Sequence, residues 1–173
     1  MRGIITKLRQ LIASNLSKDT GVMVVHTDSN ASRPKYPFYS YKFTTIRQNQ
    51  GESGNLKKSF EKSEDTHFKY DYVETLEFQP KVIMSFMCYA KDVSECEEIS
   101  YKAWEWFRLK GRRILANENI VVVNVGDIQD RTTLLITNYE YRQGFDVEFR
   151  ILHEFEDRME TIENYKIEKG GSI

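Results

Sequence analysis

Tyr139-Glu-Tyr-Arg-Gln-Gly-Phe-Asp-Val-Glu-Phe-Arg-Ile151 decides the fold, because this stretch leaves a turn and runs into strict alternation of apolar and charged residues. Successive side chains of an extended strand point to opposite faces. One face of the predicted strand therefore carries Phe145, Val147, Phe149, Ile151 and Phe155, and the other carries Asp146, Glu148, Arg150 and Glu154. The apolar face is expected to pack in a core, and the other face is charged.

Two interpretations of the charged face stay open. Charged residues on the outside of a strand most often do no more than face solvent. The order acid, acid, base, Leu152, acid also suits contact with a neighbouring copy of the chain. In that case Arg142, Asp146, Glu148 and Arg150 form a polar strip across which adjacent subunits meet head to tail, as a closed ring requires. Gly144 in this strand indicates an unusual backbone angle or a bulge.

Composition is that of an ordinary globular protein. The chain has 173 residues, 40% of them hydrophobic and 29% charged, and a domain of this size buries about 70% of its unfolded surface. Twenty-five basic and 26 acidic residues leave a net charge of −1, which argues against broad, charge-driven binding to nucleic acid or membrane. No apolar run approaches the roughly 18 residues of a membrane span or forms the core of a signal peptide, so we expect a cytoplasmic protein with no membrane partner.

Two helices are predicted. Apolar residues recur at three- and four-residue intervals through the first turns of the chain, at Ile4, Ile5, Leu8, Leu11, Ile12 and Leu16. Asp92-x-x-Glu95 has the form of a capping box, so a second helix is expected to start there and to end near Gly111. Its buried stripe is Val93, Cys96, Ile99, Ala103 and Phe107. Trp104 and Trp106 cannot both lie on that stripe, so at least one is expected at the sheet edge or against another subunit.

Apolar or alternating runs predict strands at residues 22–26, 36–47, 68–76, 78–89, 120–125, 132–139 and 142–155, with a short last strand at 162–167. Short turns separate the later strands, which favours antiparallel pairing. The expected fold class is α+β: a single domain over residues 1–173, whose mixed or mostly antiparallel sheet carries both helices on one face and leaves the other face free. Residues 168–173 are expected to form a short tail.

Residues 48–66 lack any period and are predicted to form a flexible loop. One interpretation is a hairpin tip with no role. The other is a segment that becomes ordered only against a neighbouring ring or tube, where it buries Leu56 and Phe60.

No catalytic, metal or cofactor site is predicted. His26, His67 and His153 are scattered, and no Gly-rich phosphate loop is present. Cys88 and Cys96 are expected to be buried thiols. The one compact basic cluster is Arg108, Lys110, Arg112 and Arg113 at the predicted end of the second helix. Cations at this end complement the helix dipole, which is enough to explain their placement. A more specific alternative is that they contact DNA.

The Tyr139-to-Arg142 turn and the Gly-Phe-Asp-Val-x-Phe strand after it resemble the phage neck and tail-terminator proteins. The amphipathic first helix, the Pro37–Tyr41 strand and the long central helix fit the same order of elements, from about Ile4 to Ile167. The resemblance implies a structural, non-enzymatic virion protein that is assembled in the host cytoplasm. It also implies a ring, commonly a hexamer, that caps the tail tube, docks to the head connector and touches DNA at most weakly in its lumen.

Three rivals stay open. A head-completion or connector-adaptor protein is the nearest. A nucleic-acid-binding module would need the Arg108–Arg113 cluster to form a continuous exposed face with aromatic residues. A small-molecule enzyme would need a deep pocket with convergent polar groups.

Overall fold

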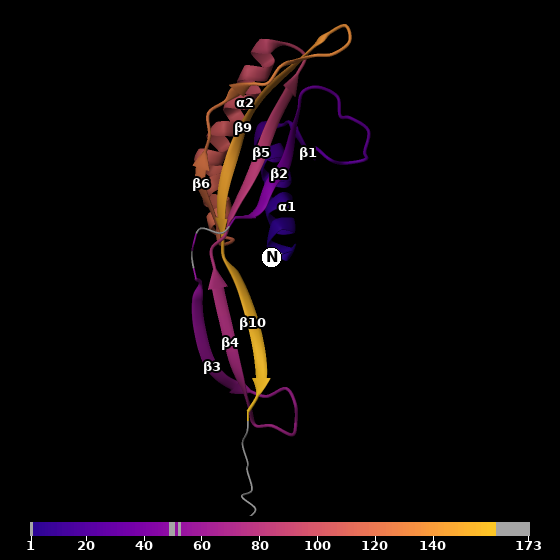
Figure 1. Cartoon of the computed structure of the whole chain (residues 1–173). Coiled ribbons are helices and arrows are strands. Elements are labelled where there is room, and N and C mark those ends of the chain that lie inside the picture. Colours follow the sequence, from indigo (N-terminus) through magenta and orange to yellow (C-terminus); the bar gives the residue numbers. More distant parts are fainter. Residues whose placement is uncertain (1, 49–50, 52, 162–173) are drawn as a thin grey trace, which may run out of the picture. The chain divides into compact units, whose positions relative to one another are not determined.

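The structure is a computed structural model, in which residues 2–48, 51 and 53–161 are described (Figure 1). The contacts within the chain gather into two compact units, each described by itself below. The larger unit comprises Met1–Gly51 and Gln79–Leu152, and the smaller comprises Glu52–Phe78 and His153–Ile173. The sequence predicts one domain, which stays a prediction, and within the described residues the smaller unit holds a second sheet that the sequence did not predict.

The larger unit contains three helices and a seven-stranded mixed sheet. The helices are α1 (Arg2–Thr20), α2 (Val93–Arg108) and α3 (Lys110–Ala116). The strands are β1 (Met23–His26), β2 (Phe38–Gln48), β5 (Lys81–Ala90), β6 (Ile120–Val125), β7 (Gln129–Asp130), β8 (Thr133–Leu134) and β9 (Tyr139–Ile151). Their order is β1-β2-β5-β9-β6, with β7 and β8 also paired to β9. Only β1 and β2 pair in parallel, so the predicted α+β fold with a mostly antiparallel sheet is confirmed.

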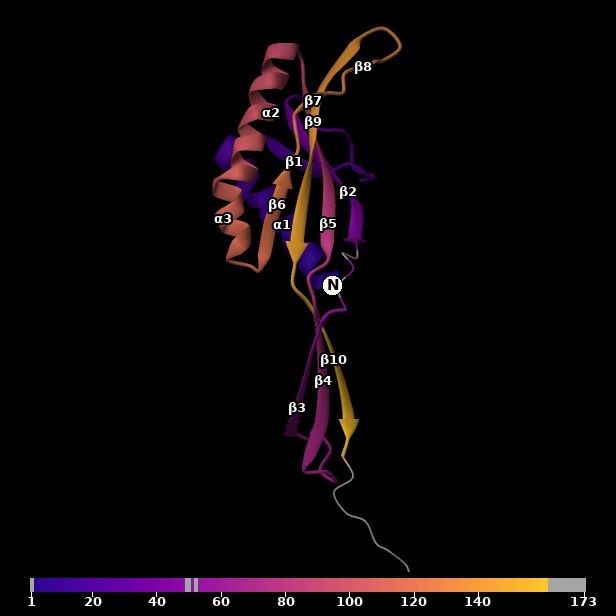
Figure 2. The ribbon, with the colours of Figure 1, turned by 60° about the vertical axis from the view of Figure 1, so that its left-hand side comes forward.

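The helices cover one face of this sheet (Figure 1, Figure 2). Tyr41, Phe86 and Phe145 stand in one row across β2, β5 and β9 and are buried. Phe107 of α2 lies against that row, with its ring centroid 5.4 Å from that of Phe86 and 6.0 Å from that of Phe145. The apolar alternation in β9 therefore supplies one wall of the core, as the sequence predicted.

The central helix starts as expected and ends earlier. Asp92 caps α2 by accepting a 2.9 Å hydrogen bond from the Glu95 backbone N–H, and the Glu95 carboxylate accepts one from the Lys91 N–H. Helix α2 stops at Arg108, and α3 follows after Leu109. The prediction of an end near Gly111 was wrong because the chain turns and resumes helix there.

The two tryptophans separate as the spacing requires. Trp106 is 5% exposed and donates to the Asp19 carboxylate at 2.8 Å. Trp104 is half-buried and donates to the carbonyl of Gly126, just beyond the edge strand β6, at 2.9 Å. The prediction that one of them packs at the edge of the sheet is confirmed.

The smaller unit is a three-stranded antiparallel sheet of β3 (Asn55–Lys62), β4 (Tyr70–Phe78) and β10 (His153–Glu160), in the order β10-β4-β3. The prediction of an unstructured loop was wrong for Asn55–Lys62, which pairs with β4 along its whole length. Its residues are all exposed, so no apolar alternation marks the strand in the sequence.

Two other strand predictions were wrong. Residues 142–155 belong to two strands, because β9 ends at Ile151 and β10 belongs to the smaller unit. Alternation continues on both sides of Leu152 and so hides the break. Residues 132–139 hold the two-residue strand β8, a turn and, at Tyr139, the start of β9. The predicted strand at 162–167 and the tail at 168–173 lie outside the described residues.

Replacing Gly111 with Ala is expected to destabilise the larger unit. A methyl group at this buried position would lie 2.4 Å from the Trp106 ring. Overpacking of this kind costs about 1–3 kcal/mol. Chemical denaturation should show the loss for Gly111→Ala, while Gly3→Ala, with nothing within 4 Å, serves as the control. Equal stability of both variants would contradict the packing described.

The two cysteines are expected to be unreactive in the native protein. Both are free and buried, and burial raises the pKa of the Cys88 thiol well above its ordinary value and that of Cys96 to about 11. At about pH 8 a thiol reagent should modify neither until denaturant is added. Because unfolded thiols ionise near pH 8.5, native stability should be full below about that pH and fall as the pH rises further. Rapid modification of the native chain would contradict this account.

Candidate assembly interfaces

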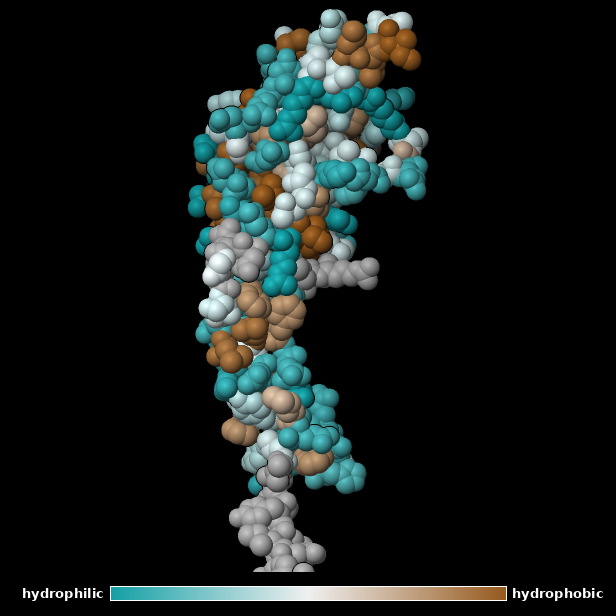
Figure 3. Space-filling model, in the orientation of Figure 1, coloured by the Kyte–Doolittle hydropathy of each residue, from teal (hydrophilic) through white to brown (hydrophobic). Residues whose placement is uncertain are grey.

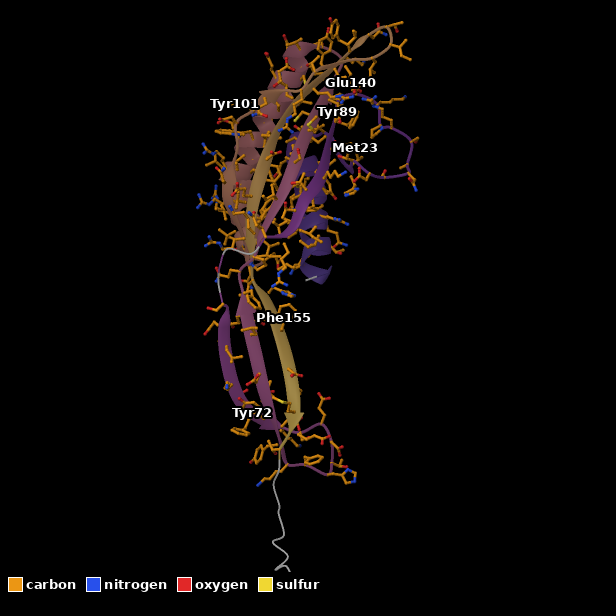
Figure 4. All side chains as sticks on the ribbon, viewed as in Figure 1. Met23, Tyr72, Tyr89, Tyr101, Glu140 and Phe155 are labelled. Carbon is orange, nitrogen blue, oxygen red and sulfur yellow. The ribbon has the colours of Figure 1, made fainter. Side chains whose placement is uncertain are left out.

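One face of the smaller sheet carries most of its large apolar side chains, with the row Lys58, Glu74 and Asp157 between them, and no helix among the described residues of this unit covers it. Directly paired residues of antiparallel strands share a face, which places Phe60, Tyr72 and Met159 in one row and Leu56, Leu76 and Phe155 in another. We call the whole set the aromatic face: Leu56, Phe60, Tyr70, Tyr72, Leu76, Phe78, Phe155 and Met159 (Tyr72 and Phe155 are labelled in Figure 4).

The aromatic face is exposed where a soluble sheet normally buries its apolar side. Phe60 is 69% exposed and Leu56 is 48% exposed. Tyr70, Phe155 and Met159 are also exposed, and brown and tan surface shows among the charged residues of this unit (Figure 3). Exposed large apolar side chains gathered on one face, here on both sides of the Lys58–Glu74–Asp157 row, are typical of a protein interaction site. The predicted contact residues Leu56 and Phe60 both belong to it.

The other face of the smaller sheet is charged and internally paired. Arg158 of β10 lies 2.7 Å from the Glu61 carboxylate of β3 and 2.6 Å from that of Glu156. Lys57 pairs with Glu77, and its hydrogen bond holds the pKa of the Glu77 carboxyl below the ordinary value. These pairs tie the three strands together across the charged face.

The predicted polar strip lies on the face of the larger sheet that turns away from the helices, and most of it is bonded within the chain. Glu148 pairs with Lys81 at 2.7 Å, and Arg142 pairs with Glu140. Arg150 is half-buried, and its Nε has no hydrogen-bond partner among the described residues. Asp146 is the open member, with 54% of its side chain exposed and Arg131 at 3.5 Å. Asp146 is therefore the strip residue that a neighbour reaches most easily.

Arg131 crosses this same face and was not found from the sequence. Its guanidinium donates to the Ser85 hydroxyl at 3.0 Å and approaches the Met87 sulfur at 3.3 Å. A methyl group at Gly144 would lie 2.6 Å from that sulfur and 3.0 Å from the Arg131 Cδ. Gly144 therefore serves close packing. The predicted bulge or unusual angle at Gly144 was wrong, because its φ is not positive and the β5–β9 register passes it without a shift.

A buried carboxylate, also missed from the sequence, organises the end of β9. Glu140 is 2% exposed, pairs with Arg33 and Arg142, and accepts a 2.7 Å hydrogen bond from the Tyr36 hydroxyl. Arg33 in addition lies 5.5 Å from the centre of the Tyr89 ring (Tyr89 and Glu140 are labelled in Figure 4). A surface hollow of about 350 Å³ beside this cluster is lined by both arginines. The cluster fastens the segment after β1 to the sheet.

The four basic residues do not form one continuous free surface. Arg108 lies 4.3 Å over the Trp104 ring, and Lys110 pairs with Asp19, whose pKa this hydrogen bond lowers. Arg112 and Arg113 are exposed on α3. The cluster therefore spans the junction of two helices, and two of its four members are engaged within the chain.

A second exposed apolar group lies on the turn between β8 and β9. Leu134, Leu135, Ile136 and Tyr139 are all exposed there, and Ile136 is fully so. The turn leads out from the sheet in Figure 2. Because the sequence predicted a strand at 132–139, this exposed apolar group was not expected. The only signal was three consecutive apolar residues, which break the alternation of a half-buried strand.

Metal and membrane signals were searched in the same residues. Across residues 2–48, 51 and 53–161, no group of three or more His, Cys, Asp or Glu side chains is arranged to hold a metal ion. Among the helices so described, none is both long and apolar enough to cross a bilayer.

Exposed apolar surface on a sheet face and on a turn is typical of a protein that contacts other proteins. Residues 3–172 of the 173 match the family described as phage neck terminator protein, and the chain belongs to that family. Its members are structural components of the phage virion, at the neck of the tail. No match was found among curated proteins.

Removing the buried carboxylate is expected to destabilise the protein far more than removing the exposed one. Glu140→Ala leaves Arg33 and Arg142 without their common partner, and because both arginines keep some contact with solvent the expected cost is about 1–3 kcal/mol. Asp146→Ala should change stability by less than about 0.5 kcal/mol, as surface substitutions do. Denaturant titration of both variants checks the contrast. A mild Glu140→Ala would mean that the cluster does not hold the fold.

Proposed function

We propose that this chain forms a closed ring that caps the phage tail tube and joins it to the head connector. Family membership supports the place in the virion. The observation that carries the assembly role is the aromatic face, because Phe60 and Leu56 are exposed on a sheet that no helix among the described residues of its unit covers. Removing such surface from water contributes about 25 cal/mol per Å² of apolar area, which must exceed the entropy cost of association.

The proposed mechanism is geometric. A head-to-tail interface joins different surfaces of identical subunits, and it closes after a fixed number of copies. The ring then offers one rim to the last ring of the tube and the other to the connector. Tube growth stops because the outer rim does not match an incoming tube subunit. The aromatic face and the exposed apolar turn around Ile136 are the two surfaces available for these contacts.

The Asp146 region is proposed as a contact between neighbouring copies. Asp146 is exposed beside Arg131, so an additional cation from a neighbour meets a carboxylate that is only weakly held at 3.5 Å. Arg142, Glu148 and Arg150 support it from within the chain. We therefore assign them to holding the strip in place, and the contact itself to Asp146.

A weak contact with DNA in the ring lumen is a second, narrower proposal. The exposure of Arg112 and Arg113 favours it, since free guanidinium groups attract phosphates. A tight grip would hinder passage of the genome, and two free cations per copy suit a loose contact. Binding of purified rings to duplex DNA should weaken steeply with added salt and should be lost in Arg112→Glu/Arg113→Glu.

The ring is tested by the mass of the purified protein and by its effect on tails. Light scattering across concentrations, with electron microscopy, should reveal rings, either free or seated on tail tubes. Phage that lacks the protein should produce tubes of uncontrolled length. Tails of normal length that fail to join heads would instead indicate a head-completion or adaptor role.

Reversal of charge at Asp146 is expected to block assembly and leave the fold intact. Asp146→Lys should keep the melting temperature of the wild-type chain and lose ring formation and infectious particles. Glu98→Lys, an exposed carboxylate on α2, provides the matched control. Normal particles from the Asp146→Lys phage would show that the strip is not an interface.

A further inference from the structure

The two outer strands of the smaller sheet carry opposite charge. Strand β3, at one edge, holds three lysines and one glutamate. Strand β10, at the other edge, holds four acidic residues and one arginine. Neither outer edge has a neighbouring strand in the described part of the chain. Edge strands present unpaired backbone groups that can pair with another chain.

Charged residues of β3 and β10 are also level with each other, which means that they pair with the same residue of β4. Lys57 of β3 and Glu156 of β10 both pair with Thr75 of β4, so they are level with each other. Lys58 and Asp157 are level in the same way through Glu74. At these two levels a lysine of one edge thus stands opposite a carboxylate of the other, two strand spacings away, whereas Glu61 and Glu160, level through Asp71, are both acidic.

Apolar residues of β3 are level with apolar residues of β10 as well. Leu56 is level with Phe155 through Leu76, and Phe60 is level with Met159 through Tyr72. Each pair lies on the aromatic face. If the β3 edge of one copy met the β10 edge of the next without an axial shift, lysines would meet carboxylates and the apolar rows would continue.

We infer that β3 of one copy pairs in parallel with β10 of the next copy, so that the small sheets join into one continuous sheet around the ring. The inference rests on the proposed ring and names the surface that closes it. Strands β3 and β10 both run antiparallel to β4 and therefore run parallel to each other. A ring keeps all copies in one orientation, so these two edges meet in parallel.

The charge pattern favours this pairing over the alternatives. Two β3 edges would bring lysines together, and two β10 edges would bring carboxylates together, and like charges at such a contact are unfavourable. Only the mixed contact joins opposite charges. Charges that serve merely to keep an edge solvated have no reason to differ in sign between the two edges.

The charges remain available although some have partners within the chain. The side chains of Lys57 and Lys58 are 59% and 56% exposed, and that of Glu156 is 50% exposed. Asp157 is exposed as well. Lysine and carboxylate groups accommodate several partners at once, so the pairs within the sheet leave capacity for a neighbour.

Charge reversal tests the pairing. Lys57→Glu/Lys58→Glu and Glu156→Lys/Asp157→Lys should each lose ring formation, or infectious particles where rings form only on tails. The two variants mixed, and the variant with all four changes, should regain assembly because opposite edges meet again. Rings from either double variant alone, or no recovery in the mixture and the fourfold variant, would overturn the pairing.

A disulfide measures the register directly. Lys58 and Asp157 of one copy are two strand spacings apart, about 9.6 Å, and a disulfide needs Cα atoms within about 7 Å. Lys58→Cys/Asp157→Cys can therefore link only different copies, and the native cysteines are buried. Oxidation of rings or tails should give a ladder of covalent oligomers. Ser59→Cys/Asp157→Cys, with the two residues on opposite faces, should give none.

The outcomes separate the two proposals. Rings without the 58–157 ladder would overturn the strand pairing and leave the ring intact. A chain that is monomeric in solution and absent from tail rings would overturn both. A full ladder confirms the pairing, and its largest member counts the copies in the ring.

Discussion

An apolar sheet face must be covered, and this chain meets that constraint in only one of its two sheets. In the larger unit, Phe107 and the other apolar residues of the helices lie over β5 and β9 and close a core. In the smaller unit, three strands carry an aromatic face on which Phe60 stays 69% exposed. The protein is thus stable by its own packing in one part and offers surface for assembly in the other.

The charged residues also have different roles in the two units. In the larger unit it is mostly used internally, since Glu140 holds two arginines and Glu148 holds Lys81. In the smaller unit it is sorted by edge, with lysines on β3 and carboxylates on β10. Internal pairs stabilise the fold, and in the proposed ring the opposite charges of the two edges would set the direction in which copies join. Both features occur in a member of the phage neck terminator family.

The sequence correctly predicted the features that depend on residues close together in the chain. The alternation of Phe145, Val147 and Phe149 identified β9 and its buried face, and the Asp92 capping box located the start of α2. The sequence did not predict the strand whose formation depends on pairing with another part of the chain. Asn55–Lys62 has no buried face to create a period, so only pairing with β4 makes it a strand. The sequence analysis named Leu56 and Phe60 as contact residues but did not predict the sheet that carries them.

The fold class, most residues of the core stripes and the family resemblance follow from the sequence, because periodicity and the order of elements can be read along the chain; Val93, expected in the core, is exposed. The three-dimensional fold was needed to show which charged residues are paired within the chain and which are exposed. Glu140 and Asp146 lie six positions apart on one strand, yet one is buried between two arginines and the other is half exposed. Their difference comes from Arg33 and Arg131, which the fold brings from elsewhere in the chain.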